Sequence, residues 1–205
     1  MIPNNSLIQP PQQKEFIYPD NLDITDLLDY ELGGIGLSDP SEGLQYQVWT
    51  ARVRGVAAST YVTLEAPNYP ETTYLTLPNI TWVRLAFDQN MHPVICVVYQ
   101  SGPAFYWYDP TIPGNTLTAL PNTAITPCCT MDDKRPLETR LGTNDVIIGY
   151  LKSNNLYYVQ QRDRYGTEYL LLASVQLLIA NPLLVRIGMD VDYRLQFQIT
   201  GQLYQ

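Results

Sequence analysis

The chain contains few cysteines and histidines, the side chains that bind zinc and titrate nearest to neutral pH. It has three cysteines and one histidine among 205 residues, and Cys96, Cys128, Cys129 and His92 show none of the spacings of a zinc site. We therefore expect no metal and no cofactor. Cys96 lies in the apolar run VICVVY, which predicts a small buried side chain. Cys128 and Cys129 are adjacent, and a disulfide between neighbours is strained, so we expect reduced thiols.

Positive charge is also scarce. The 20 acidic residues outnumber the 12 basic ones and give a formal charge of −8. Wrapping a phosphate backbone requires a basic stripe, so we expect no sequence-specific binding of nucleic acid. A negative surface is compatible with lining a channel through which DNA passes without binding.

Long apolar runs are absent. No run approaches the roughly 20 apolar residues that a membrane-spanning helix needs. The first residues, MIPNNSLIQP, have neither the basic nor the apolar region of a signal peptide. We expect a soluble protein without a membrane span, made in a cytoplasm.

Catalytic motifs are missing as well. The sequence has no GxSxG, no GxxxxGK(S/T), no GxGxxG and no HExxH, and His92 has no surrounding pattern of a triad. The adjacent carboxylates of Asp132 and Asp133 point apart on an extended chain, which favours a salt-bridged turn or interface over a hydrolase site. The run RDR at 162–164 predicts another ion-pair network. We expect no catalytic residue and no enzymatic activity.

The N-terminal part, residues 1–43, is expected to lie outside the main body. Prolines interrupt a polar segment over the first 20 residues, which predicts an extended arm that orders only against a neighbour. Thr25 is a good N-cap and Gly33 a good C-terminal stop, so we predict one short helix over 25–32. Residues 33–43, GGIGLSDPSEG, are predicted to be a turn-rich linker.

Residues 44–205 are expected to form a mainly β body of antiparallel sheets made from repeated hairpins. Short apolar runs separated by turn residues predict strands in four groups. The predicted strands are 45–53, 60–66 and 72–78, then 81–88, 94–100 and 104–109, then 145–152, 155–161 and 167–173, and finally 183–188 and 193–200. The Pro-rich segment 110–140 is predicted to be a long loop.

The second and third groups repeat each other. A shift of 51 residues places Ile95 on Val146, Tyr99 on Tyr150 and Phe105 on Leu156 without a gap. A period near 50 is typical of propeller blades. We therefore predict a propeller-like stack of antiparallel sheets or a two-sheet sandwich.

Four consecutive aromatics occur in FYWYDPTIPG, which begins at Phe105. Alternation along a strand places Phe105 and Trp107 on one face and Tyr106 and Tyr108 on the other. Because both faces are apolar, we interpret the strand as covered on both sides. The alternative is a stacking platform for a sugar or a base, made by Trp107, Tyr108 or Tyr165.

Several longer stretches carry a family resemblance, over about residues 33 to 189. GGIGLSDPSEGLQYQVWT, LAFDQNMHPV, FYWYDPTIPG, CTMDDKR and YYVQQRDRYGTEYLL are similar to those of virion structural proteins of short-tailed double-stranded DNA bacteriophages. The resemblance implies a tail or virion component without enzymatic activity. It carries over no functional residue.

These observations predict a non-enzymatic structural subunit of a bacteriophage virion. It would belong to the tail or the head–tail connection, as a nozzle, adaptor or fibre anchor. Its expected partners are other virion proteins and copies of itself in a homo-oligomer. Two alternatives are a module of the tail that binds a carbohydrate or a host receptor, and a hydrolase that uses Asp132 or Asp133.

Overall fold

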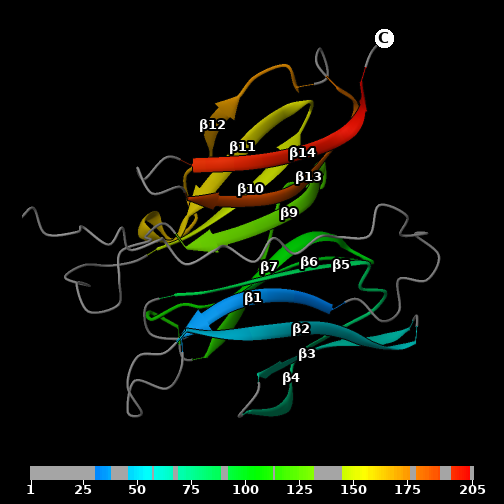
Figure 1. Ribbon diagram of the computed structural model, residues 1–205. Helices are drawn as coiled ribbons and strands as arrows, with labels where there is room; N and C mark the ends of the chain where they lie inside the picture. The colour runs from blue at the N-terminus through cyan, green and yellow to red at the C-terminus, as the bar shows by residue number, and fades with distance from the viewer. Residues whose placement is uncertain are drawn as a thin grey trace, which may run out of the picture.

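Four antiparallel sheets follow one another along the chain (Figure 1). The structure is a computed structural model that describes residues 31–37, 46–56, 58–66, 69–88, 92–112, 114–131, 145–175, 179–189 and 195–203. Strands dominate these residues, which confirms the mainly β prediction. The predicted arm and most of the predicted helix lie outside the described residues.

Three of the sheets are four-stranded meanders and the fourth is a hairpin. The first contains β1 (Glu31–Leu37), β2 (Tyr46–Val56), β3 (Ser59–Ala66) and β4 (Tyr69–Leu77). The second contains β5 (Trp82–Phe87), β6 (Pro93–Tyr99), β7 (Gly102–Tyr108) and β8 (Asn115–Ala119). The third contains β9 (Ala124–Met131), β10 (Val146–Lys152), β11 (Asn155–Gln160) and β12 (Tyr169–Leu172). The fourth contains β13 (Ile179–Met189) and β14 (Leu195–Leu203).

Three strands lie where the sequence predicted none. Residues 33–37, predicted as linker, are part of β1, and Glu31 and Leu32, predicted as the end of a helix, begin it. The glycines do not break β1, because it pairs along its whole length with β2. β8 and β9 lie inside the predicted loop 110–140, so that prediction is wrong for these strands.

Pro127 explains why β9 did not look like a strand. Proline cannot donate a ladder hydrogen bond and is tolerated at edges and bulges. β9 is the edge strand of its sheet, and its pairing with β10 shifts register between Gly149 and Leu151, beside the proline. An edge position with a bulge therefore accommodates the residue that argued for a loop.

The predicted repeat of 51 residues corresponds to a repeated structural unit. β6 and β10 are each the second strand of a four-stranded sheet, and β7 and β11 are each the third. The shift that places Ile95 on Val146 therefore superposes equivalent strands of successive sheets. The repeat is a whole sheet, with two strands that the sequence pattern did not reveal.

Each pair of neighbouring sheets encloses a hydrophobic core. Side chains of β10 alternate between two of these cores: Val146, Ile148 and Tyr150 enter the core shared with the second sheet, and Ile147 and Leu151 enter the core shared with the fourth. A strand buried on both faces reads as a continuous apolar run. This is why VIIGYL lacks the alternation of a strand with one wet face.

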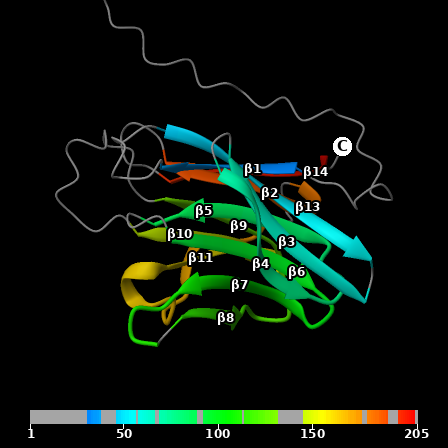
Figure 2. The same ribbon diagram turned by 90° about the horizontal axis from the view of Figure 1, so that it is seen from below.

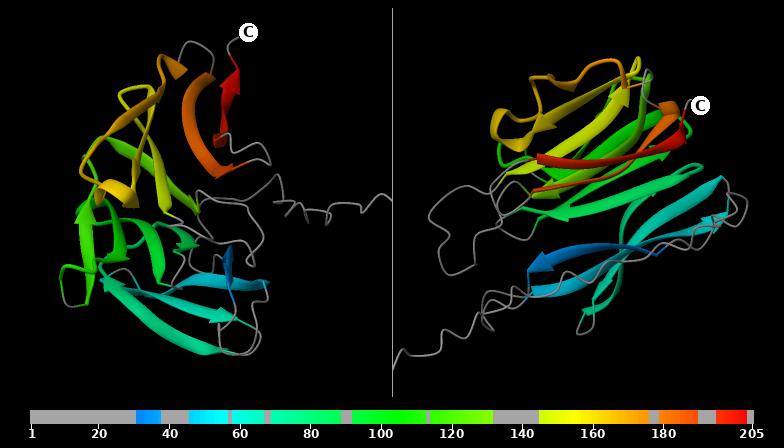
Figure 3. Two further views of the ribbon diagram at one scale, coloured as in Figure 1. Left: turned by 90° about the vertical axis from the view of Figure 1, so that its left-hand side faces the viewer. Right: turned by 45° about the horizontal axis from the view of Figure 1, so that its top comes forward.

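The sheets are arranged as an arc, with the first and fourth at its two ends (Figures 2 and 3). The first strands of successive sheets contact one another in the order β1, β5, β9, β13. This arrangement is the propeller-like alternative rather than a two-sheet sandwich. Contacts between neighbouring sheets make the stack quasi-one-dimensional.

A ladder of charged and hydroxyl side chains joins the strands of the first sheet. Arg52 lies 2.6 Å from Glu65, Arg54 lies 3.1 Å from Glu71, and Thr63 donates a hydrogen bond of 2.5 Å to Glu71. The hydrogen bond from Thr63, and then that from Arg54, lowers the pKa of Glu71. Such polar residues are typical of the capping surface at the end of a stack.

Candidate functional site at the seam of two sheets

The turn after β11 reaches from the third sheet to the second. We call this turn (161–166), with the carboxylates Asp88, Asp109 and Asp145 that it meets, the seam. The turn contains a 3₁₀-helix, Gln161–Asp163, and is followed by Arg164 and Tyr165 with φ of 56° and 59°. Neither residue is glycine, which adopts a positive φ without steric cost. Two consecutive larger residues do so at a cost of ~1–3 kcal/mol each, which their surroundings must offset.

Tyr165 packs into the core between the two sheets. Its ring centroid lies 4.6 Å from that of Phe105 and 5.0 Å from that of Trp107, both with edge-on geometry. Phe105 and Trp107 are buried, and Trp107 Nε1 donates a 3.0 Å hydrogen bond to Thr118 Oγ1. The packing interpretation of FYWY is therefore correct for these rings. Trp107 is not an exposed stacking platform, because its neighbours cover it.

Tyr106 and Tyr108 lie on the opposite face of β7, as alternation predicts. Tyr106 packs against the core between the first and second sheets. Tyr108 stacks on His92 with 4.1 Å between ring centroids. The four aromatic side chains thus pack on both faces of β7.

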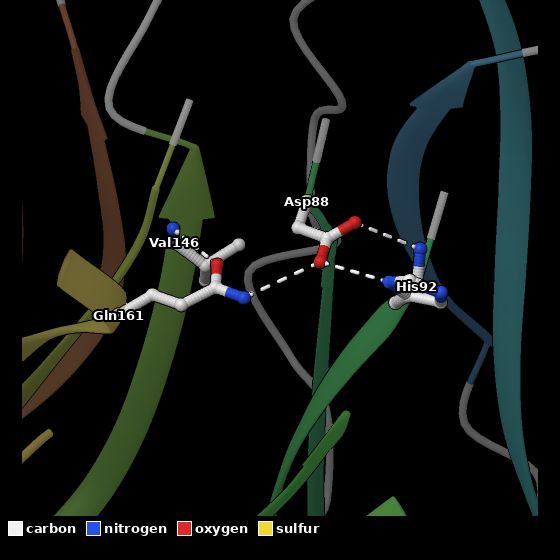
Figure 4. A network of polar contacts seen from close by, with 4 residues as sticks. All are labelled: Asp88, His92, Val146 and Gln161. Carbon is white, nitrogen blue, oxygen red and sulfur yellow. Dashed lines mark hydrogen bonds and ion pairs between the residues drawn. The ribbon is translucent and has the colours of Figure 1, made fainter. Parts of the chain in front are cut away.

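Asp88 connects the β5–β6 hairpin to the third sheet (Figure 4). Its Oδ1 accepts a hydrogen bond from the His92 amide at 2.9 Å, and its Oδ2 lies 3.1 Å from His92 Nδ1. Gln161 Nε2 donates to the same Oδ2 at 3.3 Å, and Gln161 Oε1 accepts from the Val146 amide at 3.1 Å. Asp88 is buried, so these donors replace the water that its carboxylate loses.

Two ion pairs complete the seam. Arg164 reaches Asp109 of the second sheet at 2.6 Å, and Arg162 reaches Asp145 at 2.9 Å. Burial opposes ionisation of Asp109, but hydrogen bonds from Thr111 and Arg164 outweigh it and leave its pKa below the usual value. The ion pairs predicted for the run 162–164 are confirmed for its two arginines, and Arg164 lies 55 positions from its partner Asp109 in the chain. Asp163 instead accepts a hydrogen bond of 3.0 Å from the Tyr169 hydroxyl.

Asp88 of the seam lies beside a histidine, His92. No acidic partner of His92 was predicted from the sequence, whereas the structure places Asp88 beside it across a hairpin turn. The spacing of four residues around a turn was the available signal. Within the described ranges, no serine, threonine or cysteine side chain hydrogen-bonds to His92. Asp132 and Asp133, the carboxylates of the hydrolase alternative, lie outside those ranges.

The cysteines lie near the interfaces between sheets and are free thiols. Cys96 and Cys128 are buried, which confirms the prediction for Cys96. Cys129 is half-buried, and its Sγ lies 3.5 Å from the Val94 carbonyl oxygen. Burial raises the pKa of Cys128 to about 12 and raises the pKa of Cys96 well above its usual value.

We expect Cys96 and Cys128 to resist thiol reagents in the folded protein. Burial keeps both protonated at pH 8, and the thiolate is the reactive form. Titration with Ellman's reagent should show at most one rapidly reacting thiol in the native state and all three in guanidinium chloride. Cys129→Ser should abolish any fast reaction. Three fast thiols in native protein would contradict this burial.

Comparisons with known proteins supply no relative. No protein-family model, curated protein or solved structure matches the chain. In the part of the chain that the structure describes, no helix is long and apolar enough to cross a lipid bilayer. Nor do the described residues include a cluster of three or more histidine, cysteine, aspartate or glutamate side chains placed to hold a metal ion.

Proposed function

We propose that the chain is a non-enzymatic structural subunit of a bacteriophage virion, in the tail or the head–tail connection. It would act as a nozzle, adaptor or fibre anchor. The observation that carries the proposal is the seam. There the charged and polar side chains that could take part in catalysis instead connect one sheet to the next. Asp88, Asp109 and Asp145 are buried and hold partners from the turn 161–166. The resemblance of the longer sequence stretches supports the same proposal.

A particle subunit needs a body that keeps its shape under load. Three hydrophobic cores connect the four sheets in series, and the seam adds hydrogen bonds and ion pairs across one of these junctions. Buried polar groups that have hydrogen-bond or ion-pair partners, such as Asp88 and Asp109, favour one arrangement of their neighbours. The formal charge of −8 suits a surface beside passing DNA, because it would repel phosphate.

The N-terminal segment provides a test of assembly in particles. We expect deletion of residues 1–30 to leave a folded body but to abolish incorporation into virions, because this segment is predicted to order against a neighbouring subunit. The deletion stops at residue 30 because Glu31 and Leu32 pair with Arg52 and Ala51 of β2. Circular dichroism checks folding, and mass spectrometry of purified particles checks incorporation.

A length-matched control separates the sequence of the segment from its bulk. In this control, a flexible Gly/Ser segment of equal length replaces residues 1–30. We expect it to fail in incorporation like the deletion. Normal amounts of either variant in particles would count against the proposed role of the segment.

A further inference from the structure

Two thiols from different sheets share the core between the second and third sheets. Cys96 lies on β6 and Cys129 on β9, and these strands contact each other across the junction. Cys96 is fully buried in this core, and Cys129 packs against it. Cys129 Sγ lies 3.5 Å from the carbonyl oxygen of Val94, which is two residues before Cys96 and enters the same core. The Cys129 side chain therefore reaches the part of β6 that carries Cys96.

The pKa of Cys96 agrees with a contact between the two thiols. Burial raises the pKa of Cys96 most, and a hydrogen bond with the Cys129 side chain raises it further. Arg84, which pairs with Cys96 across β5 and β6, opposes part of this rise. Cys96 thus has another sulfur atom as a close neighbour and keeps its proton at neutral pH.

Cys128 faces a different core. Successive residues of a strand point to opposite faces, and Cys128 enters the core between the third and fourth sheets. Its Sγ lies 3.6 Å from the carbonyl oxygen of Leu184 on β13. Cys129, rather than Cys128, is therefore the partner of Cys96 across the junction.

We propose that Cys96 and Cys129 form a disulfide in an oxidising medium and so fasten the second sheet covalently to the third. Facing sheets pack about 10 Å apart, a separation that a disulfide between inward-facing cysteines can span. The bond would close a loop that contains β7 and β8. This modification site goes beyond the proposed virion function and does not depend on it.

A peroxide is a suitable oxidant, because it is small and accepts two electrons. Cys129 is the point of entry, since it is half-buried whereas Cys96 is fully buried. The Cys129 sulfur attacks one oxygen of hydrogen peroxide, the O–O bond breaks, and the products are a sulfenic acid and water.

Cys96 completes the reaction. Its sulfur attacks the sulfenic sulfur of Cys129, so that the S–S bond forms and the S–O bond breaks. The departing hydroxide takes the proton of the Cys96 thiol and leaves as a second water. Together the two thiols lose two electrons, and the peroxide gains them.

Peptide mapping of the full chain tests this pairing. The reduced protein is treated with hydrogen peroxide, and the remaining thiols are alkylated in guanidinium chloride. We expect the number of free thiols to fall from three to one. Trypsin has no site between Arg84 and Lys134, so chymotrypsin, which can cleave after Tyr99 and Phe105, is used to separate Cys96 from Cys129. Mass spectrometry should identify a linked pair of peptides that dithiothreitol separates.

Alanine variants at neighbouring positions of β9 show which cysteine is linked. Cys128→Ala should keep the linked peptides and retain no free thiol after oxidation. Cys129→Ala is the matched variant and should lose the link, with two free thiols remaining. Circular dichroism checks that both variants fold, and the peptide map of the wild type needs neither of them.

Urea unfolding provides a second measurement. A disulfide that closes a loop restricts the unfolded chain, so oxidation should raise the urea midpoint of the wild type and of Cys128→Ala. Dithiothreitol should reverse this shift. The midpoint of Cys129→Ala should not rise, and this variant also controls for oxidation of methionine.

Four results of the mapping would overturn the proposal. Peroxide could leave three thiols, Cys129 could stop at a sulfinic acid, Cys129 could link to Cys128, or the linked peptides could come from two chains. Non-reducing electrophoresis detects the last of these as a species of twice 23.3 kDa. A cross-linked chain whose midpoint does not rise would also contradict the fastening of the two sheets. Each result is obtained on purified protein, so the virion proposal would stand or fall separately.

Discussion

Replacement of Phe105 by alanine is expected to lower the free energy of unfolding by about 3–5 kcal/mol. Phe105 is 1% exposed, in the core between the second and third sheets. Its ring contacts Tyr165, so truncation removes apolar contacts from both sheets and leaves a cavity at their junction. Phe105→Ala should therefore destabilise the junction between the second and third sheets more than the other junctions of the stack.

The three tryptophans allow each junction to be followed by fluorescence. Trp49 lies in the core between the first and second sheets, and Trp107 lies in the core between the second and third sheets. Trp82 packs against the core between the third and fourth sheets. Variants that retain one tryptophan each would be unfolded in urea. Phe105→Ala should lower the midpoint reported by Trp107 most, because neighbouring sheets stabilise one another pairwise.

Leu117→Ala is the matched control for Phe105→Ala. Leu117 lies in the same sheet, on β8, but is 37% exposed. Its truncation should change the free energy of unfolding by only about 0.5 kcal/mol. A loss for Phe105→Ala as small as that of the control would show that this core does not hold the two sheets together.

Gly55→Ala should destabilise the protein by about 2–6 kcal/mol, the sum of backbone strain and overpacking. Gly55 has φ of +93°, and a Cβ atom there would collide with the backbone carbonyl oxygen of Ser59 in the β2–β3 hairpin. A backbone atom cannot move aside as a side chain can. Urea unfolding monitored by Trp49, in the core beside this hairpin, is the measurement.

Gly114→Ala separates the two causes. Gly114 has a similar φ of +99°, but no atom lies within 4 Å of the position of its added Cβ. This variant should show only the strain of the backbone, about 1–3 kcal/mol. Equal losses at Gly55 and Gly114 would mean that the close approach to Ser59 contributes nothing.

Strands with strong apolar runs could be predicted from the sequence alone. β6 and β10 are buried on both faces, so VICVVY and VIIGYL stand out from the surrounding polar turns. The shift of 51 residues identified them as equivalent before any contact was known. Alternation along a strand likewise predicted that Phe105 and Trp107 lie on one face.

Strands that contain many turn-forming residues could not be predicted from the sequence alone. β1 contains Gly33, Gly34 and Gly36, and β9 contains Pro127, residues that favour loops when read locally. Pairing with β2 stabilises the first, and an edge position with a bulge accommodates the second. Tertiary pairing therefore outweighed local preference in both cases.

The sequence by itself determined the antiparallel hairpins, the repeated unit and the burial of the aromatic strand. These properties follow from periodicity and turn chemistry, which act between residues close in the chain. Only the tertiary structure decided which sheets are neighbours, that Arg164 meets Asp109, and that Asp88 holds Gln161. Such contacts depend on how whole sheets stack. No local sequence pattern indicates which residues far apart in the chain will meet.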